Sequence, residues 1–110
     1  MWQKAHVLTL AVYKATQRFP RDELFALTQQ LRRAVVSVAS NIAEGCGRSS
    51  NADFARFLWM SNGSAKEVDY QLLLASDLGY LEQSTSTELA ALLDEVKRML
   101  ASLIKSVEAG

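Results

Sequence analysis

The segment from Gln29 to Asp53 constrains the fold more than any other part of this 110-residue chain. Its apolar residues recur at intervals of four, three and four, at Leu31, Val35, Val38 and Ile42. This spacing places them on one stripe of an amphipathic helix, which must pack against a neighbour. Gly45 and Gly47 follow the stripe, and glycine commonly ends a helix because it enters the left-handed region without a Cβ penalty. The segment therefore predicts a packing helix that ends at about Glu44.

Polar residues on the same helix need hydrogen-bond partners, because serine and asparagine are unfavourable inside a helix unless their side chains are satisfied. A ligand-binding or acid–base role for Asn41 and Glu44 is one interpretation. The alternative, which we favour, is a structural polar cluster that fixes the register of packed helices. Its expected members are Ser37, Asn41, Glu44, Glu67, Tyr70 and Gln71. In this cluster the serine and asparagine reach the next helix, and the glutamate reaches Arg32, Arg33 or Arg48.

Helix signals divide the whole chain into four segments, expected at about residues 2–18, 22–44, 51–78 and 85–107. Phe19-Pro20 ends the first, because a residue before proline is pushed out of the helical region. An irregular first turn is expected near Asp22 and Glu23. Ser50 to Asp53 and Thr85 to Glu88 have the pattern of capping boxes, and no segment alternates like a strand. The sequence predicts a single all-α domain over residues 1–110, an antiparallel up-down-up-down four-helix bundle.

The third segment carries a heptad-like seam of apolar and small residues: Phe54, Leu58, Ser61, Ala65, Val68, Leu72 and Ala75. Small residues in the middle of such a seam indicate close helix approach. Gly63 in the same segment marks either a tight crossing or a tolerated weak point.

Consecutive large apolar residues suggest a second buried face. Neighbours on a helix point about 100° apart, so one core cannot bury both Leu73 and Leu74 together with Leu72. A wide stripe lining a deeper core is the alternative to self-association, which we favour because exposed apolar patches mark interfaces. The expected interface residues are Trp2, Trp59, Leu73 and Leu74.

The net charge is zero, which argues against a strongly basic nucleic-acid binder. However, residues 1–56 hold 8 Lys and Arg against 4 Asp and Glu, and residues 57–110 hold 4 against 8. The two halves either attract each other or a neighbouring subunit, or they leave a positive surface for a ligand. Arginine suits bidentate phosphate contacts. The candidate nucleic-acid-binding residues are Arg18, Arg21, Arg32, Arg33, Arg48 and Arg56.

The sequence offers little for catalysis, a metal or a cofactor. A di-metal bundle needs Glu-x-x-His pairs, whereas His6 is the only histidine and no glutamate stands three residues before it. Cys46 is the single cysteine and is expected to be an unreactive thiol. The turn from Gly45 to Ser50 could hold an anion, but it lacks the P-loop spacing, and a simple connection is the favoured interpretation. Without an apolar run of membrane length or a signal-peptide core, we expect a cytoplasmic protein.

Several motifs together resemble the four-helix-bundle proteins encoded by intervening sequences in bacterial 23S ribosomal RNA genes. The resemblance rests on Trp2 to His6, Phe19-Pro20, Leu27 to Ala34, Ser37 to Gly45, Gly47-Arg48, Phe54, Arg56 to Leu58, Glu67, Tyr70 to Leu72 and Asp77 to Tyr80. That family is similar to the accessory variability protein of diversity-generating retroelements, a pentamer that binds nucleic acid and a reverse transcriptase. The resemblance implies a four-helix bundle, a homopentamer and, if the gene lies in a retroelement, a reverse transcriptase partner. It implies no enzymatic activity.

These observations lead to two hypotheses. In the first, the chain is a non-enzymatic oligomer that binds RNA or DNA, chiefly through phosphate contacts of its arginines. In the second, it is an oligomeric scaffold that binds protein partners and no nucleic acid.

Overall fold

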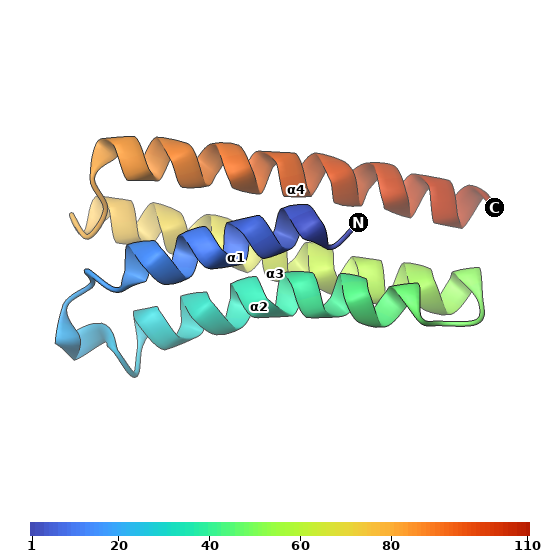
Figure 1. Cartoon of the computed structure of the whole chain (residues 1–110), viewed down its shortest axis with the longest axis horizontal. Coiled ribbons are helices and arrows are strands. Elements are labelled where there is room, and N and C mark those ends of the chain that lie inside the picture. Colours follow the sequence, from blue (N-terminus) through green and yellow to red (C-terminus); the bar gives the residue numbers. More distant parts are fainter.

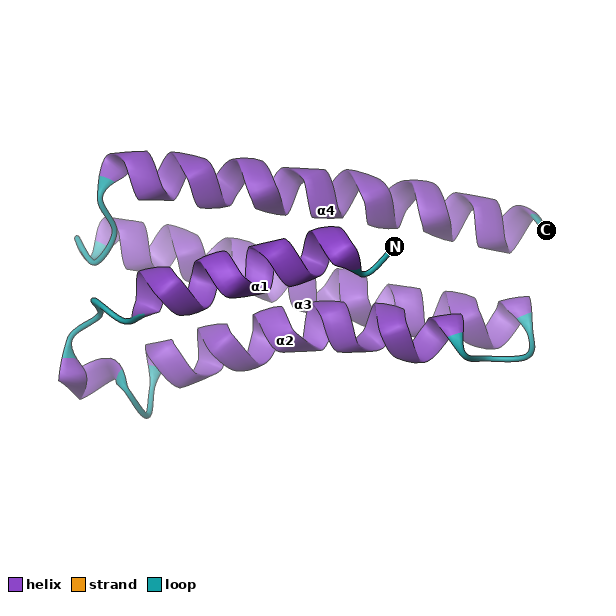
Figure 2. Cartoon of the chain, viewed as in Figure 1, coloured by secondary structure: helices purple, strands orange, loops and turns teal.

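The computed structural model describes all of residues 1–110 and is entirely helical outside its connections. Its elements are α1 (Gln3–Thr16), the short 3-10 helix η1 (Arg21–Glu23), α2 (Leu27–Cys46), α3 (Asn51–Asp77) and α4 (Gln83–Ala109). The chain reverses direction at each connection between the α-helices (Figure 1), and no strand is present (Figure 2). The predicted all-α four-helix bundle is confirmed.

The four helices form a square in which α1 and α3 are diagonal. Each of these two helices is the neighbour of α2 and α4 and not of the other. The outer faces of α1 and α3 consequently point away from each other. Because α1 is only 14 residues long, the N-terminus lies part-way along the bundle, whereas α2, α3 and α4 continue past it (Figure 1).

The core is built from the predicted stripes. Leu31, Val35, Val38 and Ile42 of α2 are all fully buried. The seam of α3 is also buried, except that Phe54 is half-buried and packs on the core. On α4 the buried residues are Leu89, Leu93, Val96, Leu100 and Ile104. Helical periodicity alone therefore located most of the core.

The connection between α1 and α2 contains the expected irregular turn. It is a separate 3-10 helix, η1, followed by a turn at Leu24 to Ala26 before α2 begins at Leu27. Tyr80, which follows α3, also holds this connection in place. Its hydroxyl donates a hydrogen bond to Glu23 Oε2 at 2.8 Å, and its ring centroid lies 5.4 Å from that of Phe19. The negative carboxylate of Glu23 raises the pKa of the Tyr80 phenol, first through this hydrogen bond.

The end of α2 differs from the prediction. The helix continues through Gly45 to Cys46, and Gly47 caps it with an ordinary φ of −89° instead of a left-handed one. Gly45 is required for a different reason, because a Cβ there would lie 2.9 Å from Phe54 Cδ1 and 3.0 Å from Phe57 Cβ. The glycine lets α3 approach α2 closely at this point.

The helix ends of α3 follow the sequence signals, but the start of α4 does not. Ser50 Oγ accepts a hydrogen bond from Asp53 N at 3.2 Å, as predicted for the cap of α3. Gly79 adopts φ of 80°, and Tyr80 N donates to Ala75 O at 2.9 Å, which forms a Schellman motif. The prediction of a second capping box, from Thr85 to Glu88, is wrong. Helix α4 begins earlier, at Gln83, so Thr85 already lies inside the helix.

The close contact at Gly45 leads to a stability prediction. Gly45→Ala should lower the free energy of unfolding by about 1–3 kcal/mol, because the added methyl group must displace the Phe54 ring and the Cβ atom of Phe57. Gly47→Ala is the matched control, since a Cβ there has only an ordinary contact of 3.6 Å and no φ strain. Urea unfolding of both variants measures the difference. Equal stability of the two variants would contradict the close-approach explanation.

Candidate nucleic-acid interface

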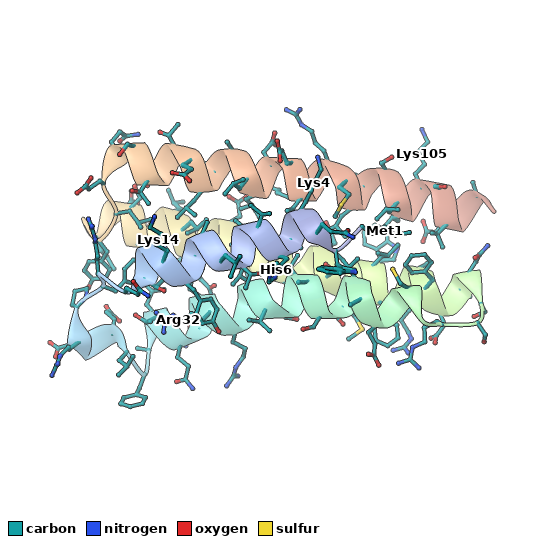
Figure 3. The ribbon with its side chains drawn as sticks, in the orientation of Figure 1. Met1, Lys4, His6, Lys14, Arg32 and Lys105 are labelled. Atoms are coloured by element: carbon teal, nitrogen blue, oxygen red, sulfur yellow. The ribbon has the colours of Figure 1, made fainter.

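The six candidate arginines do not form one surface. Arg18, Arg21, Arg32 and Arg33 lie around the α1–α2 connection, whereas Arg48 and Arg56 lie around the α2–α3 connection. These connections are at opposite ends of α2, which is about 30 Å long at 1.5 Å per residue. Figure 3 shows Arg32 and Lys14 toward the α1–α2 end. Four of the six therefore lie toward the same end of the bundle, on more than one face, and we call them the α1–α2 arginines.

Acidic neighbours neutralise the other two arginines. Arg48 forms an ion pair with Glu44, as predicted, and its Nε lies 3.8 Å from Asp53 Oδ2. Arg56 Nε lies 2.9 Å from Asp53 Oδ1. Both guanidinium groups also lie over the ring of Phe57, at 4.7 and 4.5 Å from its centroid. Two cations thus face two carboxylates, which also makes the Gly45 to Ser50 turn a poor site for an anion.

Arg32 is held in place without an acidic partner. Its Nε donates to Thr16 Oγ1 at 2.8 Å, and Nη2 donates to the Tyr13 carbonyl oxygen at 3.4 Å. Its guanidinium carbon lies 4.8 Å from the Tyr13 ring centroid. The charge is fixed between α1 and α2 by neutral groups, so it remains available to an anion.

The other α1–α2 arginines are also largely free. Arg21 and Arg33 form no ion pair within 4.0 Å, and Arg18 reaches Glu82 only at 4.0 Å, with both side chains mostly exposed. Ion pairs between exposed side chains contribute little to stability, so this contact holds Arg18 only weakly. Between residues 13 and 33 there are five basic side chains and only two acidic ones, Asp22 and Glu23. This segment therefore carries net positive charge, whereas the α3–α4 connection at the same end of the bundle adds the acidic residues Asp77 and Glu82.

The predicted polar cluster exists only in part, and its contacts differ from those expected. Ser37 Oγ lies 2.9 Å from Ser64 Oγ of α3, and Asn41 Nδ2 donates to Ser37 O and Oγ at 2.9 and 3.0 Å. Tyr70 is instead 63 % exposed, on the outer face of α3. Glu67 and Gln71 make no side-chain hydrogen bond to Ser37 or Asn41, although they line a shallow groove beside Ser37.

A buried polar contact between α2 and α3 was not predicted from the sequence. Ser61, fully buried, donates from Oγ to the Val38 carbonyl oxygen at 2.8 Å. The signal was present, because Ser61 stands in the middle of the apolar seam and a buried hydroxyl there requires a partner. A clamp of small polar residues, Ser37, Ser61 and Ser64, joins the two helices.

The expected interface residues are mostly exposed. Trp2, Trp59 and Leu73 are 44, 51 and 57 % exposed. The prediction that Leu74 belongs to an interface is wrong, because Leu74 is half-buried and packs against the core of its own chain. Gly63 marks no tight crossing within the chain, because nothing lies within 4 Å of a Cβ built there. Further exposed apolar residues were not foreseen, among them Val7, Leu10 and Phe25.

No group of three or more His, Cys, Asp or Glu side chains is placed to hold a metal ion. Cys46 is exposed and lies 3.7 Å from the Met1 sulfur. None of the helices is both long enough and apolar enough to cross a lipid bilayer.

Residues 1–102 match the family model described as 23S rRNA-intervening sequence protein. The fold is similar to the crystal structure of a protein of unknown function from the S23 ribosomal protein family of Bacteroides thetaiotaomicron VPI-5482. The TM-score is 0.84, with 24 % sequence identity over 94 % of this chain and 97 % of that chain. No curated protein matches in sequence.

Proposed function

We propose, given that this chain belongs to the 23S rRNA-intervening sequence protein family, that it is a non-enzymatic cytoplasmic protein that binds RNA or another nucleic acid as an oligomer. The observation that carries the proposal is the unequal pairing of the arginines at its two ends. Arg21, Arg32 and Arg33 have no acidic partner within 4.0 Å, whereas Arg48 and Arg56 share Glu44 and Asp53. Phosphates would therefore contact the α1–α2 end.

Phosphate binding suits this end for reasons of charge and of geometry. Arginine donates in a planar fork that matches two phosphate oxygens. Arg32 is already oriented by Thr16 and Tyr13, so its side chain gives up less conformational entropy when it binds. Contacts of this type depend strongly on salt and give little sequence discrimination.

The outer faces of α1 and α3 support self-association. Trp59, Tyr70 and Leu73 are exposed along one side of α3, with exposed Gly63 between them. Their intervals of four, seven and three residues place all four on one helix face, which we call the α3 ridge. Val7 and Leu10 are exposed on α1, the diagonally opposite helix. Two different apolar faces on one subunit suit a head-to-tail contact better than a two-fold dimer, and such contacts close into a ring when the rotation between successive copies allows it.

We propose five copies in that ring, from the resemblance to the pentameric accessory variability protein of retroelements. If the bundle axes run along the ring axis, the α1–α2 arginines of all copies gather on one rim. A modest charge on each copy would then become a strong local field. A reverse transcriptase is a further proposed partner where the gene lies in a retroelement.

The two ends of the bundle provide a matched test of nucleic-acid binding. We expect Arg21→Ala/Arg33→Ala to weaken binding of labelled ribosomal RNA fragments, and to reduce the slope of log K against log salt by about one for each phosphate that no longer meets an arginine. Arg48→Ala/Arg56→Ala is the control and should bind nearly as tightly as the wild-type protein. Fluorescence anisotropy at about 50 and about 200 mM salt measures both.

Absence of binding at about 50 mM salt, or binding that neither salt nor either arginine pair changes, would contradict the proposal. Either result would favour the alternative, an oligomeric scaffold for protein partners. An equal reduction of affinity in both double variants would contradict the assignment to the α1–α2 end.

The α3 ridge provides the test of assembly. Leu73→Lys should dissociate the oligomer, because it places a charge in the proposed apolar contact. Leu78→Lys is the control, since Leu78 is 49 % exposed at the end of α3 but lies away from the ridge. Sedimentation velocity gives the mass of each species. A wild-type protein that stays monomeric at micromolar concentration would rule out the ring.

A further inference from the structure

An open groove lies between α1, the α1–α2 connection and the first turns of α2. Its lining residues are Tyr13, Leu24, Phe25, Thr28, Gln29, Arg32 and Arg33. Two of the α1–α2 arginines thus form part of a wall that also contains aromatic, hydroxyl and amide groups. Phosphate contacts alone do not require those groups.

Phe25 is the most exposed large apolar residue of the chain. Its side chain is 85 % exposed, in the turn directly before α2, and the neighbouring Leu24 is 47 % exposed. It therefore contributes almost nothing to the core. An aromatic ring presented in this way beside free arginines offers a stacking surface to another flat ring.

The opposite part of the lining carries fixed positive charge. The Arg32 guanidinium lies over the Tyr13 ring at 4.8 Å and is held by the Thr16 hydroxyl at 2.8 Å. Arg33 follows it in sequence, is exposed, and has neither a hydrogen bond nor an ion pair. An anion bound here would displace no existing ion pair.

Thr28 provides an independent observation. It is only 3 % exposed, and its Oγ1 is buried without any hydrogen-bond partner. Gln29, next to it, presents an exposed side-chain amide. The exposed Gln29 amide can donate to and accept from the edge of a base, and the Thr28 hydroxyl behind it is a buried polar group that has no partner within the chain. The groove therefore combines a ring surface, cations and an exposed amide.

We propose that this groove binds an unpaired nucleotide of a single-stranded nucleic acid, with the base stacked on Phe25 and the phosphate held by Arg32 and Arg33. A base in a duplex has its faces covered by its neighbours and cannot stack on the protein. The inference rests on the proposed nucleic-acid binding and adds a preference for unpaired bases. We favour a nucleotide over a second copy of this chain, because a nucleotide offers both a flat ring to Phe25 and an anion to the two unpartnered arginines.

The test compares labelled probes of about eight nucleotides, single-stranded RNA and single-stranded DNA, with an RNA duplex. Adenosine monophosphate serves as competitor, to distinguish a free nucleotide from a strand. We expect both single strands to bind more tightly than the duplex. Phe25→Ala should weaken single-strand binding by about 5- to 100-fold and leave duplex binding unchanged, since the variant has no ring on which a base can stack.

Two conservative variants separate stacking from a simple apolar contact. Phe25→Tyr keeps the ring and should retain single-strand binding, whereas Phe25→Leu keeps apolar bulk and should bind single strands as weakly as the alanine variant. Because Phe25 is so exposed, all three variants should fold, which circular dichroism checks. Sedimentation velocity should show the same assembly for each.

Equal binding of single strand and duplex, with no effect of Phe25→Ala, would overturn the proposal that the groove binds an unpaired nucleotide. The α1–α2 arginines would then remain as a site for phosphates alone. Binding of neither form overturns both proposals. Loss of assembly in Phe25→Ala and its retention in Phe25→Leu would assign the groove to a second copy of the chain. Displacement by adenosine monophosphate, without a preference for either strand over the duplex, would assign it to a free nucleotide.

Discussion

The close contact between α2 and α3 is the constraint on which the rest of this structure depends. Gly45 admits Phe54 and Phe57 at one end, and Ser61 donates to the Val38 carbonyl near the middle. Once these helices are joined, the buried stripe of α2 and the seam of α3 face the same core, and α1 and α4 cover it. The outer side of α3 is then left without a partner, and so is that of α1. The same contact that builds the core therefore determines which surfaces remain exposed.

Helical periodicity is a local property, and for that reason the sequence predicted the fold class, the helix ranges and most of the core. Two errors arose where local signals compete with packing. Gly45 has the residue type of a helix end, but the approach of Phe54 explains it, and only the tertiary structure shows that approach. Thr85 begins a capping pattern, yet the helix starts earlier at Gln83. The polar cluster was misassigned because the outward rotation of Tyr70 depends on the packing of α3.

The candidate site could have been narrowed further from sequence alone. Glu44 and Arg48 are four residues apart, and Asp53 and Arg56 are three apart, which are the spacings of neutralising pairs on a helix. Arg32 and Arg33 have no acid at those distances. The contact of Arg32 with Tyr13 was not predictable, since it depends on the rotation of α1 against α2. The exposure of Phe25 was likewise hidden, because the expected helix included that residue.

The central claim is that the α1–α2 end, and not the α2–α3 end, contacts nucleic acid. Ultraviolet cross-linking of the wild-type protein to single-stranded RNA, followed by mass spectrometric mapping of the linked peptides, tests it most directly. We expect cross-links within residues 13–33, with Tyr13 and Phe25 as the cross-linked aromatic residues. Cross-links confined to residues 44–57, or distributed over both ends, would contradict it.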